Sequence, residues 1–335
     1  FDGHDDGLGA GEMSRFVRQW ATQLPENHSM QFFSQSITLN TTTKHPLKIP
    51  KSPTLLKRLL DMAKKGLSAT ALSNYIADPI RFYNNHVLSV SETEELEESV
   101  ANHTLGIVIH NTLEELYTPY VSKALTVKNI ERMQGAHKQI LQKHFENQLG
   151  KSSHTTGKNL LLFTAAAYSI SRVLEADKKD ILSGSRIELL GLEEHRVVTR
   201  NYSALQHPIT FHGVIDRIDR KDGILRILDY KTGQTNSKEL RLAEISDCLS
   251  DPVYGKSFQV LFYSMLWAEE DPNTPFFAGV ISLKNTASGT MLLDLGTGRK
   301  KRTELLTKDL ESFEKELEKL VVEIYTPEIA FTEAT

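Results

Sequence analysis

Two short stretches of the sequence, Gly213–Asp219 (GVIDRID) and Asp229–Gly233 (DYKTG), decide the fold of this chain. Each stretch places ionisable side chains directly beside apolar, strand-forming residues. Burying an unpaired charge costs several kcal/mol, so charged groups in an apolar strand need partners or a function. Between the stretches lies Lys-Asp-Gly at 221–223, and Asp-Gly supplies the positive φ that a tight hairpin turn requires. The sequence therefore predicts two neighbouring antiparallel strands that carry Asp216 and Asp229.

The predicted hairpin gathers three ionisable side chains on one face. Asp229 and Lys231 are two positions apart, so their side chains point to the same side of a strand. Asp216 joins them when the strands pair across the turn. Two carboxylates at one point make an oxygen-rich site suited to Mg²⁺ or Mn²⁺, and the lysine can orient or deprotonate an attacking water. A structural ion-pair network on a hairpin explains the same residues, and their spacing does not decide between the two.

The apolar pattern changes period along the chain and predicts an α/β fold. Helical spacing and strand-like runs alternate in the order helices, strands, helix, strand pair, helix, which favours one α/β domain with an N-terminal helical elaboration. The predicted helices cover residues 68–83, 105–117, 127–149, 159–182, 257–269 and 306–324, and the predicted strands cover residues 186–200, 209–218, 224–230, 277–283 and 290–295.

The composition is typical of a soluble globular protein. Of the 335 residues, 39% are hydrophobic and 24% are charged, and the net charge of −4 neither favours nor excludes a nucleic-acid partner. The single cysteine, Cys248, rules out a disulfide framework within the chain and favours a reducing, cytoplasmic setting. The most apolar run, residues 160–170, is too short to cross a membrane, so no membrane partner is expected.

The first part of the chain has a different character. Residues 1–66 are polar and rich in loop signals, with Pro46, Pro50 and Pro53 close together. We expect a linker or the remnant of a preceding region here, followed by the domain at residues 67–335. The chain begins with Phe1 rather than Met, so we also expect it to belong to a longer protein.

Together with two further motifs and an opening segment, the central stretches resemble the RecB-like branch of the PD-(D/E)XK nuclease superfamily. Upstream, the run GIVIHNTLEELY at 106–117 resembles the helical motif whose histidine helps to bind the metal. Downstream, Gln259–Tyr263 resembles the Gln-x-x-x-Tyr motif, and residues 67–82 resemble the segment that opens the domain. Each match alone is weak, but four in the family's order, from Leu67 to the C-terminus, are specific.

This resemblance implies a restriction-endonuclease-like fold, in which a mixed central β-sheet is flanked by helices. It also implies a Mg²⁺- or Mn²⁺-dependent nuclease that hydrolyses phosphodiester bonds of DNA. Carried over residue by residue, the implied metal ligands are His110, Asp216, Asp229 and the Tyr230 carbonyl, the catalytic residues are Asp216, Asp229 and Lys231, and the substrate-binding residues are Gln259 and Tyr263.

Within this branch, the sequence resembles the C-terminal nuclease domains of bacterial AddB-type helicase–nuclease subunits. That resemblance implies an exonuclease acting on single-stranded DNA ends in recombinational repair, with a helicase subunit or a helicase region of the same polypeptide as partner. Residues 1–66 would then be the remnant of a helicase-like region. Many such domains hold an iron–sulfur cluster through one cysteine near the position of Ala77 and three beyond the last helix. This sequence lacks those cysteines, so no cluster is expected.

Several candidate residues have simpler explanations. A histidine on an apolar helix face, such as His110, is commonly a hydrogen-bonded core residue. Gln259 and Tyr263 lie four positions apart on one helix face, where they can reach a phosphate backbone or act as a capping amide and a packed ring. Glu194, on the strand before the hairpin, could add a water-mediated metal contact, with Glu193 as its competitor.

Two other functions compete with the nuclease. One is a catalytically silent nuclease-like module that only binds DNA or a partner, which the complete motif argues against. The other is a metal-dependent hydrolase with a closed pocket for a different substrate. We expect Arg217 and Asp219 to brace the hairpin, and the basic run Arg299–Arg302 is either a DNA-binding rim or a solvated face.

Overall fold

The computed structural model describes residues 15–24, 27–29, 46–90, 98–151, 153–268, 275–284 and 289–334. The chain divides into two compact units, residues Phe1–His45 and Pro46–Thr335. The described part of the first unit contains helix α1 (Arg15–Thr22). The second unit holds both central stretches and the candidate site residues.

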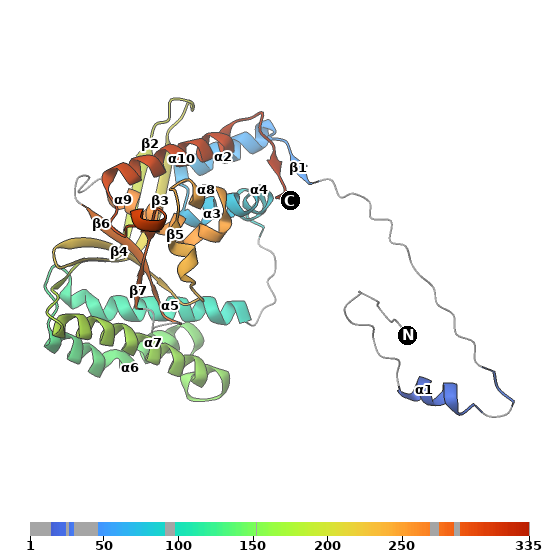
Figure 1. The fold of residues 1–335 in the computed structure, drawn as a ribbon, viewed down its shortest axis with the longest axis horizontal. Coiled ribbons are helices and arrows are strands. Elements are labelled where there is room, and N and C mark those ends of the chain that lie inside the picture. The colour runs from blue at the N-terminus through green and yellow to red at the C-terminus, as the bar shows by residue number, and fades with distance from the viewer. Residues whose placement is uncertain are drawn as a thin grey trace. The chain divides into compact units, whose positions relative to one another are not determined.

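A mixed β-sheet forms the centre of the second unit (Figure 1). Its strand order is β2-β3-β4-β6-β7, and only β4 and β6 run parallel. A parallel pair needs a crossover, which here includes helix α9 (Gly255–Trp267). The strands of this sheet are β2 (Ile187–Arg200), β3 (Ile209–Lys221), β4 (Ile224–Lys231), β6 (Phe276–Ser282) and β7 (Thr290–Leu292).

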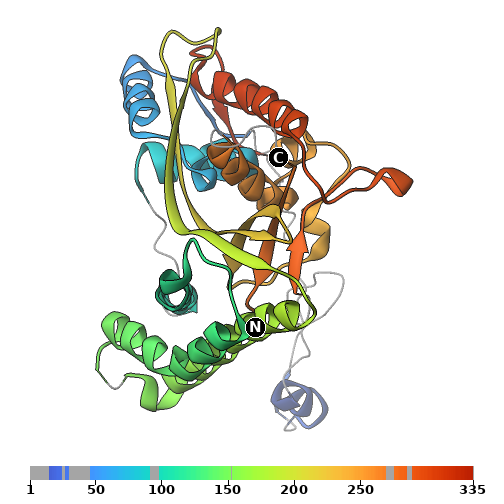
Figure 2. The ribbon, with the colours of Figure 1, turned by 90° about the vertical axis from the view of Figure 1, so that its left-hand side faces the viewer.

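Helices cover both faces of this sheet, as Figures 1 and 2 show. On one side lie α5 (Glu98–Tyr117), α6 (Val127–Leu149) and α7 (Gly157–Leu182), and on the other lie α2 (Pro53–Lys65), α9 and α10 (Thr307–Tyr325). Two separate apolar clusters fill the interfaces. Ile218 and Ile227 pack in the cluster that includes α9, whereas Tyr230 packs in the cluster of α5–α7. This arrangement confirms the predicted fold class.

The remaining elements are short. Helices α3 (Ala69–Ala77), α4 (Pro79–Phe82) and α8 (Asp247–Ser250) join the α9 side of the core, and a π-helical turn covers Tyr83–Val87. Two small strand pairs complete the unit, β1 (Lys48–Ile49) with β9 (Phe331–Thr332), and β5 (Arg241–Leu242) with β8 (Asp294–Leu295). Turns of 3₁₀ helix lie at Thr118–Tyr120, Ser153–Thr155, Ser237–Leu240, Pro252–Tyr254 and Gly298–Lys300. None of the helices in the described ranges is both long enough and apolar enough to cross a lipid bilayer.

The turn between β3 and β4 has the predicted form. Asp222 and Gly223 have φ values of 54° and 85°, the two consecutive positive angles of a tight hairpin turn. The turn sets the register, which pairs Ile218 with Ile227 and Arg217 with Leu228. Continued by one residue, this register places Asp216 opposite Asp229. The local turn chemistry therefore brings the two carboxylates together.

Residues 46–66 differ from the linker that the sequence predicts. Helix α2 buries Leu55, Leu59 and Ala63 in the core, and the Lys51 ammonium donates hydrogen bonds of 2.8 and 2.9 Å to carbonyls at the end of α10. The dense prolines suggest a loop, but Pro53 stands in the first turn of α2, where its missing N–H is no loss. The compact unit accordingly begins at Pro46, ahead of the predicted domain start. Most of residues 1–45 lie outside the described ranges.

Candidate metal centre

Three carboxylates lie in a row across neighbouring strands. The β2–β3 register pairs Leu192 with Arg217 and Glu194 with Ile215, which places Glu193 opposite Asp216. Asp216 in turn lies opposite Asp229 on β4. Asp216 and Asp229 are only 7% and 2% exposed, so little water screens their charges.

Helix α5, on the α5–α7 side of the sheet, places His110 beside this row of carboxylates. Its Nδ1 lies 3.2 Å from Oε1 of Glu193 and 3.6 Å from Oδ1 of Asp216, and its Nε2 lies 3.3 Å from the Tyr230 carbonyl oxygen. The buried neighbours Val108 and Ile109 hold this turn of α5 in the core. One ligand atom each from His110, Glu193 and Asp216 lies within 4.8 Å of the other two, so the group could hold a metal ion.

Tyr230 contributes through its backbone. Its N–H donates a 2.6 Å hydrogen bond to Oδ2 of Asp216, and its carbonyl faces His110. Its ring is buried and meets the His110 ring edge-to-face at 5.8 Å. The strand thus aims one peptide group at the centre while the Tyr230 ring packs in the apolar cluster of α5–α7.

A hydrogen-bonded chain connects the hairpin to helix α9. The Lys231 ammonium lies 2.8 Å from Oδ2 of Asp229 and donates a 2.6 Å hydrogen bond to Oε1 of Gln259. The Gln259 amide N–H then donates to the Tyr263 hydroxyl at 2.8 Å. Helical spacing of four residues puts Gln259 and Tyr263 on one face of α9. The structure therefore brings both helix residues to the hairpin carboxylates and shows their amide and hydroxyl bonded to each other.

Gly213 lets α9 approach the sheet. A Cβ at this position would lie 2.9 Å from Cε1 of Tyr263 and 3.0 Å from Cδ1 of Leu266, closer than ordinary packing permits. The glycine that opens the GVIDRID stretch is therefore required by the crossing of α9.

The electrostatics of the centre reflect crowded negative charge. Burial and the neighbouring Asp229 raise the pKa of Asp216 well above its ordinary value. Burial opposes protonation of His110, but the Glu193 hydrogen bond and the nearby aspartates outweigh it and raise the pKa of His110 to about 9. Both shifts mean that the centre binds positive charge. A divalent cation held by carboxylate, carbonyl and imidazole donors fits this arrangement.

Glu193, rather than Glu194, reaches this centre. The carboxylate of Glu194 lies 3.9 Å from Arg196, whereas that of Glu193 lies 3.2 Å from His110. Glu193 has a φ of 47°, in the left-handed region, which interrupts the side-chain alternation of β2. Strand periodicity alone therefore could not choose between the two glutamates.

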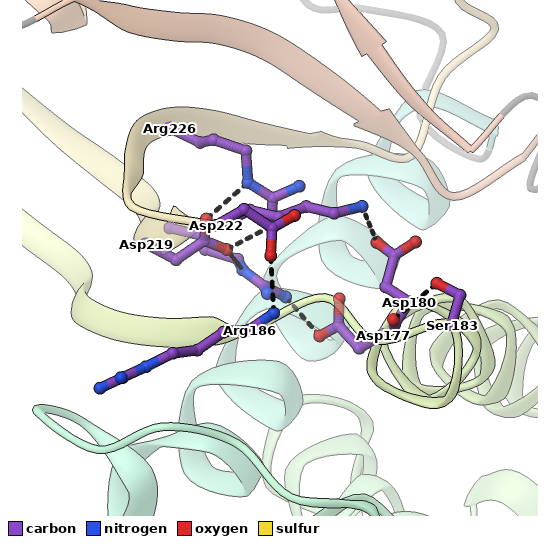
Figure 3. A network of polar contacts seen from close by, with 9 residues as sticks. Asp177, Asp180, Ser183, Arg186, Asp219, Asp222 and Arg226 are labelled. Carbon is purple, nitrogen blue, oxygen red and sulfur yellow. Dashed lines mark hydrogen bonds and ion pairs between the residues drawn. The ribbon is translucent and has the colours of Figure 1, made fainter.

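A buried ion network braces the hairpin from its other face (Figure 3). Arg217 and Arg226 each lie 2.6 Å from the Asp219 carboxylate, and Arg217 also donates to Asp177 of α7 at 2.8 Å. Arg217 and Asp219 are fully buried. The network ties β3, β4 and α7 together directly behind Asp216, in agreement with the predicted bracing role.

The basic run has a partly structural role. Arg302 lies 2.5 Å from Asp309 in the first turn of α10, whereas Arg299, Lys300 and Lys301 are exposed. Cys248 is buried in the core.

The chain was compared with known protein families and curated proteins. The family described as the PD-(D/E)XK nuclease superfamily matches residues 66–335, which include both central stretches and helices α5 and α9. No curated protein matches the chain.

Proposed function

Because this chain belongs to the PD-(D/E)XK nuclease superfamily, we propose that it is a Mg²⁺- or Mn²⁺-dependent deoxyribonuclease. One observation carries the proposal. His110, Glu193, the buried Asp216 and the Tyr230 carbonyl converge on one point, and the Lys231 ammonium lies 2.8 Å from the carboxylate of Asp229 on the neighbouring strand. This combination supplies both a metal centre and a cation beside it.

The proposed metal ligands are His110, Asp216, Asp229 and the Tyr230 carbonyl. When bound, the metal ion supplies Lewis acidity that polarises the scissile phosphate and lowers the pKa of a water ligand. The hydrogen bond from Tyr230 N–H to Asp216 fixes one carboxylate oxygen and leaves the other facing His110. The ligands are thus held in place by the strand itself rather than by a mobile loop.

Lys231 is proposed to position the attacking water. A lysine ammonium has three N–H donors. Gln259 accepts from one of them and Asp229 contributes an ion pair, which leaves N–H donors for the water or a phosphate oxygen. Attack on phosphorus forms one P–O bond as the bond to the leaving oxygen breaks; the attacking water gives up a proton to solvent, and the leaving oxygen takes one up from solvent. The ammonium also offsets the negative charge that develops on the phosphate.

The finer assignment follows from the motifs. We propose that the chain belongs to the RecB-like branch; the histidine motif on α5 and Gln259 and Tyr263 on α9 support this, since both helices meet the hairpin. By the resemblance to AddB-type nuclease domains, the substrate is single-stranded DNA ends supplied by a helicase, in recombinational repair in the cytoplasm. We propose that Gln259 and Tyr263 orient both the DNA strand and the Lys231 ammonium.

The test is degradation of end-labelled single- and double-stranded DNA with Mg²⁺ or Mn²⁺. Asp229→Ala and Lys231→Ala should each lower cleavage by about 10³-fold or more, since each removes a group that acts on the reacting atoms. Both variants should keep the circular dichroism spectrum of the wild type. Lys319→Ala, which removes an exposed lysine paired with Glu316, is the matched control and should cleave normally.

Two results would contradict the proposal. Cleavage at the wild-type rate in either site variant would exclude these residues. A folded wild-type protein that binds metal and DNA but cleaves neither single- nor double-stranded DNA would instead support the catalytically silent binding module.

A further inference from the structure

Glu193 has an unusual backbone for a strand residue. Its φ of 47° is the left-handed conformation, which is energetically unfavourable for a residue with a side chain. The other described non-glycine residues with positive φ, at positions 89, 122 and 222, lie outside the strands. A strained residue inside a regular strand needs a specific interaction to hold it, and for Glu193 that interaction is with His110.

The contact between Glu193 and His110 determines which ring nitrogen of His110 carries a hydrogen. Oε1 of Glu193 lies 3.2 Å from Nδ1 of His110, and both side chains are largely shielded, at 22% and 24% exposure. An ionised carboxylate only accepts hydrogen bonds, so Nδ1 must carry the hydrogen. Asp216 is a weaker competitor, because its Oδ1 is 3.6 Å away and its Oδ2 accepts from Tyr230.

When the hydrogen of the neutral His110 ring is on Nδ1, Nε2 has a free lone pair. Nε2 lies 3.3 Å from the Tyr230 carbonyl oxygen, which is also only an acceptor. In the neutral imidazole with hydrogen on Nδ1, two electron-pair donors therefore face each other. Such a pair is repulsive by itself and becomes favourable when a proton on Nε2 or, in its place, a metal cation lies between the donors.

We infer that Glu193 is a positioning residue that holds His110 as the Nδ1–H tautomer, so that Nε2 and the Tyr230 carbonyl together face the metal ion. Metal-binding histidines commonly donate their other N–H to a carboxylate in this way. The inference rests on the metal dependence in the proposed function. It gives Glu193 a role that differs from direct ligation.

Direct ligation by Glu193 makes the opposite prediction. If Glu193 and Asp216 bound the metal with Nδ1, that nitrogen would lose its hydrogen, and Nε2 would donate to the Tyr230 carbonyl. The two arrangements place the proton on opposite nitrogens of His110. The tautomer therefore decides between them.

The first experiment reads the tautomer by NMR of the Mg²⁺-loaded protein labelled with ¹⁵N-histidine. His110→Asn assigns the His110 signals by their loss. We expect hydrogen on Nδ1 in the wild type and in Glu193→Gln, since the amide oxygen still accepts the hydrogen bond. Glu193→Ala should lose the fixed tautomer. Glu194→Ala, which alters the neighbouring glutamate that faces Arg196, should match the wild type.

The second experiment measures Mn²⁺ binding by calorimetry. Loss of a carboxylate that orients a metal-binding histidine typically weakens affinity by about 10–100-fold, and we expect this for Glu193→Ala. Glu193→Gln should restore most of the affinity, and Glu194→Ala should leave it unchanged. Thermal melting of each variant checks that it is folded.

Three results would overturn the inference. They are a hydrogen on Nε2 of His110 in the Mg²⁺-loaded wild type, a loss of Mn²⁺ affinity in Glu193→Gln as large as in Glu193→Ala, or wild-type Mn²⁺ affinity in Glu193→Ala. These outcomes do not depend on DNA cleavage. A wild type that binds Mn²⁺ but cuts no DNA would contradict the nuclease proposal alone. A wild type that binds no Mn²⁺ would contradict both.

Discussion

At the scale of single residues, the centre is a concentration of like charge that the fold holds together. Glu193, Asp216 and Asp229 come from three strands, and burial together with the neighbouring negative charges raises the pKa of Asp216. Lys231 and His110 are the cations that offset this charge. Neighbouring amide and carboxylate groups therefore control where each proton and each N–H donor lies.

Gln259 gives the first prediction at this scale. Gln259→Ala removes the acceptor that holds the Lys231 ammonium and should lower the single-turnover cleavage rate by about 100-fold, as expected for a misplaced reacting group. The DNA affinity, measured in Ca²⁺, reports the proposed contact of Gln259 with the strand separately from this rate. Tyr263→Phe keeps the ring against Gly213 but removes the hydroxyl that fixes the amide, and should cause a smaller loss. A Gln259→Ala protein that cleaves at the normal rate would contradict its role in positioning Lys231.

At the scale of elements, the hairpin is clamped between two helical layers by different means. On the α9 side the contact is largely apolar, with Gly213 allowing close approach, and it includes the hydrogen bond from Lys231 to Gln259. On the α7 side it includes the Arg217, Asp219, Arg226 and Asp177 network shown in part in Figure 3. Buried ion pairs contribute little net stability, yet removing one partner is costly.

Arg217→Met tests this network. The substitution leaves Asp219 and Asp177 with fewer partners inside the core, and should lower the free energy of unfolding by about 3–5 kcal/mol. Arg172→Ala is the control, because its pair with Glu175 is exposed and lies within one helix, where such a pair is worth less than about 1 kcal/mol. Urea denaturation measures both. Equal effects of the two substitutions would contradict a bracing role.

At the scale of the whole molecule, stability is linked to protons and metal. The pKa of His110 is raised to about 9, whereas an unfolded chain releases this proton near pH 6.5. The raised pKa of Asp216 acts in the same direction. The folded protein thus binds more protons than the unfolded chain across this range, so its stability falls as the pH rises.

Melting temperatures in EDTA should therefore decrease from pH 6.5 to pH 9. The stabilisation from protonated His110 is complete below about pH 6.5 and is lost as the pH rises through about 9. Mg²⁺ should raise the melting temperature more at pH 9 than at pH 6.5, because protons no longer compete with it. His110→Asn should flatten the profile. A melting temperature that rises with pH in EDTA would contradict this linkage.

The extent of the domain gives a further prediction. A protein that begins at Gly66, where the family match starts, lacks β1 and α2, whereas one that begins at Pro46 keeps them. The shorter protein should be less stable by several kcal/mol, since burial of a leucine contributes about 1.5–3 kcal/mol and Leu55 and Leu59 are both lost. Denaturant midpoints of the two proteins measure the difference. Equal midpoints would show that residues 46–65 are dispensable.

The sequence by itself determined the hairpin, the order of the elements and the fold class, because turn chemistry and apolar periodicity act over short distances. Asp222 and Gly223 fix the register, and that register is enough to place Asp216 opposite Asp229. Only the tertiary structure decided which glutamate joins His110, since Glu193 lies far from it in sequence and its backbone breaks the strand alternation. The same holds for α2, whose buried leucines are recognisable only from their partners in the core.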